Sequence, residues 1–366
     1  MALPKVVYEV ALSKIPGLGP IMGRQLVAQF GDMEGVWHAT KDALQSISSI
    51  NDAVVNEILT SNPEELALPD IEFCEKERVK ITSFLDEDYP TRFKHIPDAP
   101  MLYFSRGNWD AHYPRTVAIV GTRKPSQYGI QMCEQLVEDL LPYDVQIISG
   151  MAYGIDSIAH KTANQKNIPN IAVMGTGMDI IYPAGHRVLY REIQENGAIL
   201  SEYPIKMRTD WENFPRRNRL IAGLADVVVV VQSAKRGGSL ITADFGNQYY
   251  KDVFAIPGRI NDAASEGCNG LIKQSQAHLY QSIEDIAYIM NWTPGDIKAD
   301  KQASLFIDLN EQEQLIVDLI RGKEEAGVDW LHQKAKIPLS ELASLLLNLE
   351  FNGVIRSLPG KQYTIT

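Results

Sequence analysis

The sequence predicts an α/β protein built on a doubly wound, mostly parallel sheet, with a small all-helical unit before the sheet and a helix-and-hairpin unit after it. Short β-branched runs alternate with helical stretches through the middle of the chain, and most of these runs lack polar alternation. Both ends of the chain instead show apolar residues at helical spacing. A chain of 366 residues is long enough for two or three such units.

The first 70 residues form the predicted N-terminal helical domain. Within it, the segment Ile15-Pro16-Gly17-Leu18-Gly19-Pro20 separates two helical patterns, and Arg24 follows shortly after. This pattern resembles a helix-hairpin-helix, in which glycines let backbone N–H groups approach a phosphate at the start of a helix. A tight turn inside a small helical interaction domain explains the same residues, and both interpretations stay open.

Short apolar runs predict the strands of the central domain, which we place at residues 71–292. They are TVAIV (116–120), VQIIS (145–149), NIAVM (170–174), AILS (198–201), VVVVV (227–231) and DVFAI (252–256). Strands with both faces buried are typical of a parallel sheet covered by helices. The alternation of strands and helices therefore predicts a doubly wound α/β domain.

The C-terminal region predicts a linker followed by a winged helix at residues 305–366. The linker is the polar segment from Thr293 to Ala303. The winged helix rests on helical periodicity at Leu309–Leu319 and Leu339–Glu350, and on a hairpin of Val354–Arg356 and Tyr363–Ile365 around Pro359-Gly360. Such a fold binds duplex DNA or contacts another protein. The charges in SELASLLLNLE are both acidic, which favours contact with protein.

Bulk composition indicates a soluble, cytoplasmic protein with no cofactor. The chain is 45% apolar and 22% charged, as in ordinary globular proteins. No window contains 18 uncharged apolar residues, and the N-terminus lacks the pattern of a secretion signal, so we expect no membrane association. Cys74, Cys133 and Cys268 form no CxxC pair and no HExxH occurs, so we expect a reduced compartment and no metal site.

The net charge of −11 limits how the protein could bind a nucleic acid. Neutralising phosphates requires clustered Lys and Arg side chains. A protein this acidic cannot cover nucleic acid with its whole surface, so any such site must be local.

Functional residues of a doubly wound sheet lie just after its strands. Gly121-Thr122-Arg123-Lys124 follows the first run, where a glycine turn exposes backbone donors and a guanidinium can grip a phosphate. We interpret this segment as an anion cradle. An ordinary strand-to-helix turn with two solvated basic side chains is the alternative.

A second glycine-containing turn follows VQIIS and runs from Gly150 through Tyr153 to Asp156, and we include Gly150 and Tyr153 in the candidate DNA-binding site. Asp156 and His160 are four residues apart on the predicted helix. This spacing would suit an acid–base pair, but we favour a helix-stabilising hydrogen bond between the two side chains.

The turn after VVVVV combines two glycines with a basic pair at the start of a helix. Its residues are Lys235, Arg236, Gly237, Gly238 and Ser239. Glycine amides and hydroxyl groups at a helix N-terminus favour an anion. Helix capping alone would explain Ser239, but capping does not require the adjacent basic pair.

The densest basic cluster precedes VVVVV. Five basic residues against two acidic ones give the segment 206–219 a local charge of +3, and Trp211 stands nearby. Aromatic faces beside a basic groove are what unstacked bases require. The residues we assign to this site are Phe214, Arg216, Arg217, Asn218 and Arg219. The alternative is a solvated basic helix start with Phe214 in the core.

Several familiar catalytic motifs are missing from the sequence. It contains no GxxxxGK[ST], which argues against a P-loop ATPase, and no GxSxG, which argues against an α/β-hydrolase. Gly175-Thr176-Gly177 follows NIAVM, but Ile180 replaces the third glycine of a dinucleotide site. We therefore expect no enzyme activity.

Together, the clusters resemble the DNA-processing protein A family (DprA, also called Smf). The resemblance lies in AIVGTRKPSQYG, SGMAYGIDSIAH, GTGMDIIYPAGH, LSEYP, NFPRRNRLIAGLADVVVVVQ, RGGSLITA, VFAIPG and GCNGLI, which extend in the family's order from Ala118 to Ile272. It implies an extended Rossmann-like domain that binds single-stranded DNA in a positively charged pocket, forms a homodimer and helps to load the recombinase RecA in natural transformation.

The resemblance also implies roles for individual residues. The family's Gly-Ser/Thr-Arg element falls on Gly121, Thr122 and Arg123, and its glycine-serine turn falls on Gly237 to Ser239. Its Phe-Pro-x-Arg-Asn-Arg element falls on Phe214 to Arg219 and implies base stacking and phosphate binding. The chain departs from the family at Tyr153, where a basic residue is frequent, so a phosphate contact is lost there or replaced by stacking.

A second hypothesis is an enzyme that acts on a nucleotide. Nucleoside-monophosphate phosphoribohydrolases have similar sheets with a PGGxGTxxE turn. Gly237 and Gly238 match that turn, and Asp244 falls at its acidic position, but Arg236, Leu240 and Ile241 replace its proline, glycine and threonine. A purely structural adaptor that works through both terminal domains is a third hypothesis.

Overall fold

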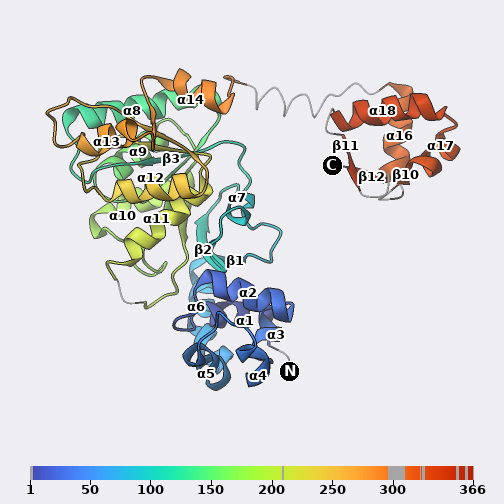
Figure 1. Cartoon of the computed structure of the whole chain (residues 1–366), viewed down its shortest axis with the longest axis horizontal. Coiled ribbons are helices and arrows are strands. Elements are labelled where there is room, and N and C mark those ends of the chain that lie inside the picture. The colour runs from blue at the N-terminus through green and yellow to red at the C-terminus, as the bar shows by residue number, and fades with distance from the viewer. Residues whose placement is uncertain are drawn as a thin grey trace. The chain divides into compact units, whose positions relative to one another are not determined.

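The computed structural model describes residues 3–207, 210–295, 310–321, 323, 326–351, 354–358 and 362–365. They belong to two compact units, Met1–Pro294 and Gly295–Thr366 (Figure 1). The first unit contains the N-terminal helices and a large sheet, and the second contains a small sheet with its own helices.

Short helices form the N-terminal part of the first unit. They are α1 (Lys5–Ser13), α2 (Pro20–Phe30), α3 (Met33–Trp37), α4 (Lys41–Gln45), α5 (Asp52–Thr60) and α6 (Pro63–Glu77). Side-chain oxygens of Asp32, Thr40, Asn51 and Asn62 accept backbone N–H groups where α3 to α6 begin. The helical N-terminal part is confirmed. Residue 70, where we expected a domain boundary, lies inside α6, and the division into domains stays a prediction.

The predicted hairpin forms between α1 and α2. Gly17 adopts a φ of +81°, and Gly19 is the N-cap of α2. Arg24 turns toward the rest of the first unit, because its Nη1 donates to the Ile96 carbonyl at 3.4 Å and its guanidinium lies 5.8 Å from the ring centroid of Phe84. Phosphate binding by this hairpin stays a prediction.

A nine-stranded sheet occupies the centre of the first unit, in the order β1-β2-β6-β5-β4-β3-β7-β8-β9. Its strands are β1 (Lys80–Ser83), β2 (Leu102–Gly107), β3 (Thr116–Val120), β4 (Gln146–Ser149), β5 (Asn170–Val173), β6 (Gly197–Ser201), β7 (Val227–Val230), β8 (Asp252–Ala255) and β9 (His278–Leu279). The pairs β1–β2 and β2–β6 are antiparallel, and every pair from β6 to β9 is parallel.

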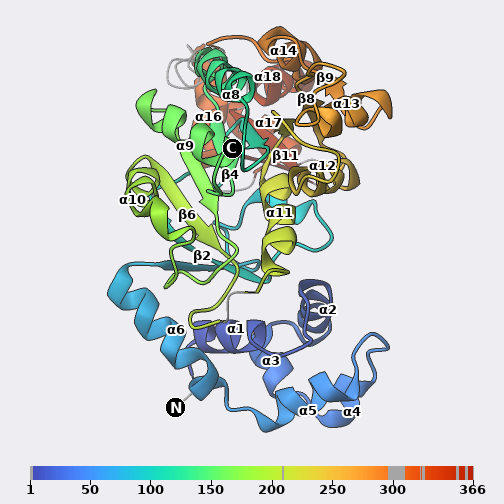
Figure 2. The same cartoon turned by 90° about the vertical axis from the view of Figure 1, so that its left-hand side faces the viewer.

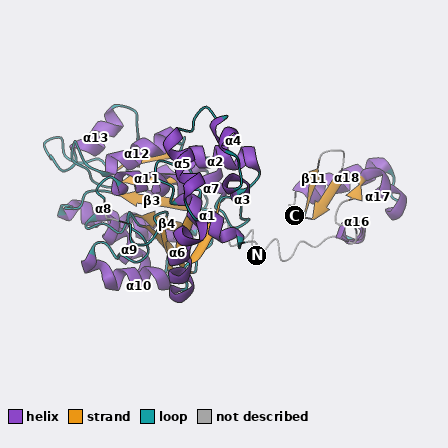
Figure 3. Cartoon of the chain, turned by 90° about the horizontal axis from the view of Figure 1, so that it is seen from below, coloured by secondary structure: helices purple, strands orange, loops and turns teal. Residues whose placement is uncertain are grey.

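Helices cover both faces of this sheet (Figures 2 and 3). One layer contains α8 (Gln127–Leu140), α9 (Ile155–Gln165), α10 (Arg187–Glu195) and α14 (Ile283–Met290), and the other contains α7 (Thr91–Lys94), α11 (Asn213–Leu224), α12 (Ser239–Gln248) and α13 (Glu266–Lys273). Alternate residues of β3 join opposite cores: Ile119 packs with the α8 layer and Val120 with the α11 layer. The predicted doubly wound, mostly parallel sheet is confirmed.

The predicted apolar runs correspond to β3 through β8, within one residue at most ends. The sequence analysis missed β1, β2 and β9. Their residues give little signal, because β1 is a polar edge strand, KITS, and β9 has two residues. The apolar run of β2 stands alone in the sequence, because its antiparallel partners β1 and β6 lie elsewhere along the chain.

The second unit has the predicted winged-helix arrangement. It contains α16 (Glu311–Arg321), β10 (Ala326–Gly327), α17 (Val328–Ala335), α18 (Leu339–Phe351), β11 (Ile355–Leu358) and β12 (Gln362–Ile365), with strand order β10-β12-β11. Helix α17 was not predicted. Leu309, the Pro359-Gly360 turn and most of the predicted linker lie outside the described residues.

No helix in the described part of the chain has the length and apolar character needed to cross a membrane. Cys74, Cys133 and Cys268 are buried and unpaired. Among the described residues, no cluster of three or more His, Cys, Asp or Glu side chains is arranged to hold a metal ion. The cytoplasmic location stays a prediction.

A buried polar network between α9 and β5 corrects one expectation. Nδ1 of His160 lies 2.8 Å from Oδ1 of Asn170, whose amide donates to Oδ1 of Asn164 at 2.7 Å. Asp156 instead accepts the Ala152 N–H at 3.3 Å. The expected hydrogen bond between Asp156 and His160 is therefore wrong, because Asn170 at the start of β5 offers the imidazole a closer buried partner.

We expect His160 to make stability depend on pH. Burial lowers the pKa of His160 to about 4 from its ordinary value of 6.5. Between these two values the unfolded chain binds the extra proton, so the free energy of unfolding falls as the pH falls. Substituting His160→Gln should reduce the loss between pH 7 and pH 5 by about 2 kcal/mol, measured by urea unfolding. An unchanged pH dependence in the variant would contradict this prediction.

Candidate functional site

The direction of strand addition reverses between β3 and β7. From β3 the chain continues to β4, β5 and β6 on one side, and from β7 it continues to β8 and β9 on the other. The connections that leave these two carboxyl ends diverge, and ligands of open α/β sheets bind in such a crevice. Here the crevice holds a cavity of about 460 Å³.

Ten residues that the sequence analysis assigned to the site line this cavity, which we call the cationic cavity. They are Gly121, Thr122, Arg123, Lys124, Phe214, Arg217, Asn218, Gly237, Gly238 and Ser239. They come from the connection after β3, from the start of α11 and from the start of α12. Arg123 and Lys124 are exposed, and Asp156 is the acidic residue among the lining side chains.

Close backbone contacts hold the connection after β3. The Ile155 N–H donates to the Thr122 carbonyl at 3.1 Å, and the Thr122 N–H donates to the Gln232 carbonyl at 2.7 Å. Gly154 has a φ of +83°, and a Cβ there would lie 2.3 Å from the Thr122 carbonyl oxygen. Only glycine fits at this position, and the packed loop leaves the Arg123 side chain at the mouth of the cavity.

Arg217 is buried and joins α11 to the ends of two strands. Its Nη1 donates to the carbonyl of Gly150, at 3.0 Å, and to that of Val173. Burial raises the pKa of the neighbouring Asp156 carboxyl, while the positive charge of Arg217 acts in the opposite direction. Arg217 therefore positions the helix and partly opposes the effect of burial on Asp156, in addition to lining the cavity.

The start of α12 supplies the far wall of the cationic cavity. Gly238 is the N-cap and Ser239 is the first helical residue, whose hydroxyl donates to Ser233 at 2.9 Å. Ser239 is therefore not the capping residue that one interpretation of the sequence required. Asn218 joins α11 to this wall, because its Nδ2 lies 3.5 Å from the Gly238 carbonyl. The positive end of α12 faces the site.

A second, smaller cleft of about 30 Å³ adjoins the cationic cavity, and we call it the aromatic cleft. Its lining residues are Arg123, Gly150, Ala152, Tyr153, Gly175, Tyr182, Pro183, Phe214 and Arg217. Two further residues that we predicted for the site, Gly150 and Tyr153, line this cleft. Phe214 lines both spaces and is half-buried, so it forms a wall between them instead of lying in the core.

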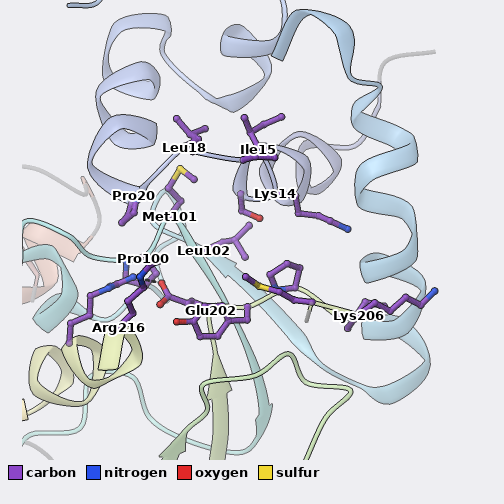
Figure 4. A pocket seen from close by; sticks show the side chains of 18 residues that line it. Lys14, Ile15, Leu18, Pro20, Pro100, Met101, Leu102, Glu202, Lys206 and Arg216 are labelled. Carbon is purple, nitrogen blue, oxygen red and sulfur yellow. Dashed lines mark hydrogen bonds and ion pairs between the residues drawn. The ribbon is translucent and has the colours of Figure 1, made fainter. Parts of the chain in front are cut away.

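Two predicted arginines lie elsewhere. Arg216 and Arg219 line a larger cavity of about 880 Å³ together with Ile15, Leu18 and Pro20 of the N-terminal hairpin (Figure 4). Arg219 is buried there, where its Nη2 donates to the Glu202 carboxylate and its Nη1 donates to the Asp98 carbonyl at 2.7 Å. The exposed Arg216 pairs with Glu212 one helical turn earlier.

The basic pair after β7 is also outside the two spaces. Lys235 forms an ion pair of 3.1 Å with Glu266 and lines a separate cavity. Arg236 is exposed on the same turn. Neither side chain lines the cationic cavity or the aromatic cleft.

The sequence analysis did not assign Tyr182, Thr242 or Asp156 to the site. Tyr182 lies eight residues after NIAVM, so the rule that site residues come just after a strand did not identify it. It nevertheless stands within the block GTGMDIIYPAGH. Asp156 was considered only as a partner of His160. Thr242 lies in the first turn of α12 and would have followed from Ser239 and helical spacing.

The fold and the cavity define a class of protein: a Rossmann-like α/β protein with a crevice lined by basic side chains at the switch point of its sheet. Models of two known families match this chain. The model of DNA recombination-mediator protein A matches residues 80–291, and that of the DprA winged helix domain matches residues 301–361. The chain therefore belongs to the DprA/Smf family of DNA-processing proteins.

Individual relatives agree with this assignment. Protein Smf of Escherichia coli is 35% identical over 284 residues, 75% of this chain and 74% of the relative, and DNA processing protein DprA of Streptococcus pneumoniae is 41% identical over 218 residues, 58% and 75%. The X-ray structure of the S. pneumoniae protein superposes with a TM-score of 0.65 at 32% identity, covering 79% of this chain and 98% of that one. Helicobacter pylori DNA processing protein A, in a structure concerned with its single-stranded DNA binding mode, gives 0.53 at 31% identity and covers 59% and 98%.

We expect Arg219 to stabilise the fold. Substituting Arg219→Ala removes the partner of the Glu202 carboxylate, whose side chain is 14% exposed, and should lower the free energy of unfolding by about 1.5–3 kcal/mol. The matched variant Arg216→Ala removes an exposed side chain and should change it by less than about 0.5 kcal/mol. Urea unfolding at pH 7 measures both, and equal effects of the two substitutions would refute this distinction.

Proposed function

We propose that this protein binds single-stranded DNA without sequence preference in the cationic cavity and catalyses no reaction there. The proposal depends on one observation: Arg123, Phe214 and Arg217 line the same crevice in a chain of net charge −11. The positive charge is local, as a site in an acidic protein must be.

The chemistry of the lining suits a polynucleotide backbone. The side chains of Arg123 and Lys124 offer donors for phosphate oxygens, and the positive N-terminal end of α12 favours their negative charge. Phe214 offers a ring face to a base. Phosphates carry no sequence information and every base has a π-face, so these contacts tolerate any sequence. Bases in a duplex are already stacked, which favours a single strand.

The relatives support the same ligand. The H. pylori protein, 31% identical to this chain, is described by its single-stranded DNA binding mode. The family model that matches the α/β unit is that of a recombination mediator. Both descriptions belong to those proteins, and here they support the inference from the cavity.

The nucleotide-acting enzyme is less well supported by the geometry. Its acidic residue would be Asp244, which lines the separate cavity beside Lys235. Oδ2 of Asp244 accepts a hydrogen bond from Gln248 at 3.0 Å. An acid at that position is not among the residues that line the cationic cavity.

The family to which the chain belongs, and not the cavity, supports the partners that we propose. We propose that the protein delivers the bound strand to RecA and acts as a homodimer. We also propose that the winged helix contacts protein. Glu341 and Glu350 are the charged residues of α18, so this helix carries no cation for phosphates.

Substituting Arg123→Ala should weaken binding of a labelled single-stranded oligomer about tenfold or more, because a charge-assisted contact with phosphate is lost. The slope of log K against log salt should fall by about 0.7 for the lost contact. Mobility shift or fluorescence anisotropy at several salt concentrations measures both. Arg191→Ala, an exposed arginine on α10, is the control. Unchanged affinity in Arg123→Ala would refute this site.

Incubation with nucleoside monophosphates tests the enzyme hypothesis directly. We expect no release of free base above a blank without protein, measured by chromatography. Base release that disappears in Asp244→Asn would instead support the phosphoribohydrolase alternative.

A further inference from the structure

Three exposed aromatic side chains lie around Phe214, outside the lining of the cationic cavity. The exposed fraction is 52% for Tyr153, 38% for Tyr182 and 74% for Trp211. The ring centroid of Phe214 lies 5.0 Å from that of Tyr182 and 6.3 Å from that of Trp211. Tyr153 and Tyr182 line the aromatic cleft with Phe214. We call these four side chains the aromatic row.

Packing holds two members of the row, Tyr153 and Phe214, in place. The Tyr153 ring meets the buried His186 ring edge-on, with centroids 4.6 Å apart, and Nδ1 of His186 lies 2.9 Å from the Met151 carbonyl. The Phe214 ring lies against the backbone of Gly175, where a Cβ would approach it to 2.8 Å. The Tyr153 and Phe214 rings therefore present fixed surfaces, which reduces the entropy lost when a planar ligand stacks on them.

The two sides of Phe214 differ in chemistry. Lys124 and the start of α12 line the cationic cavity alone, the rings of Tyr153 and Tyr182 line the aromatic cleft alone, and Arg123 lines both. A nucleotide has the same polarity, because its phosphate and its base point in different directions from the sugar. A strand whose phosphates occupy the cationic cavity would place its bases beside the aromatic row.

The volume of the cleft decides how the bases would bind. A cleft of about 30 Å³ is too small to hold a nucleobase. The bases must therefore stack on the exposed outer faces of the rings and cannot be inserted between them. The 74% exposure of Trp211 leaves a large face available for this contact.

We propose that Trp211, Tyr182 and Tyr153 extend Phe214 into a stacking platform for successive unpaired bases of a single strand. This inference rests on the proposed function and adds residues that make base contacts only. Tyr153 thus supplies a ring contact at the position where a basic residue would supply a phosphate contact.

The test compares an oligo-dT with an abasic deoxyribose-phosphate oligomer of the same length and charge. Trp211→Ala and Tyr182→Ala should each weaken binding of oligo-dT roughly tenfold or more, with the salt slope unchanged. Neither substitution should change binding of the abasic oligomer. Tyr288→Ala, which removes a ring that is 87% exposed on α14, is the matched control and should bind both oligomers like the parent.

The outcomes separate this inference from the proposed function. If the parent protein binds neither oligomer, the proposed function fails. If the parent binds and Arg123→Ala weakens binding, but the ring variants bind oligo-dT normally, only the stacking platform fails. Equal losses for oligo-dT and the abasic oligomer would also overturn it, since such losses would come from the backbone or the fold.

Tryptophan fluorescence gives a readout that does not depend on a change in affinity. Oligo-dT should quench part of the emission of the parent, which has five tryptophans, and Trp211→Phe should remove the quenched part while retaining binding. The abasic oligomer should quench neither protein. Quenching of equal size in Trp211→Phe would contradict a base stacked on Trp211.

Discussion

The candidate site depends on the buried guanidinium of Arg217. It crosses from α11 to the carbonyl groups of Gly150 and Val173, at the carboxyl ends of β4 and β5. These carbonyls lie where the strand ladder stops and would otherwise lack a partner in a buried place. By satisfying them, Arg217 fixes the first turns of α11 against the sheet. Phe214 and Asn218, on either side of it in the sequence, are thereby brought to the crevice between β3 and β7.

Charge is distributed so that an acidic protein can offer one cationic surface. Asp156 is buried near Arg217, and the largely buried Glu202 carboxylate pairs with the buried Arg219. Buried acids with a cationic partner contribute little field at the surface. Arg123 and Lys124 remain exposed at the mouth of the cavity. The net charge of −11 resides on other surfaces, where it opposes binding of nucleic acid outside the crevice.

Sequence patterns predicted the parts of the fold that repeat and missed the parts that depend on distant partners. Apolar runs located β3 to β8, and the rule that ligands bind after parallel strands located Gly121–Lys124 and Gly237–Ser239. In the basic cluster of α11, charge alone could not show which arginines line the cationic cavity and which line the cavity beside the hairpin. Helical geometry turns Arg216 and Arg219 away from Phe214, toward the cavity beside the hairpin, and Arg219 meets Glu202, a residue that no local pattern connects to it.

Asp156 and Ser239, which line the cationic cavity, have structural partners, and this fits the binding function that we propose. A hydrolase would need a carboxylate or hydroxyl free to take a proton from water. The Asp156 carboxylate accepts the Ala152 N–H and is buried beside Arg217, and the Ser239 hydroxyl donates to Ser233. Both groups therefore already have structural partners. The side chains of Arg123 and Lys124 stay exposed and can only donate, which suits the reversible binding of phosphate oxygens along a flexible strand.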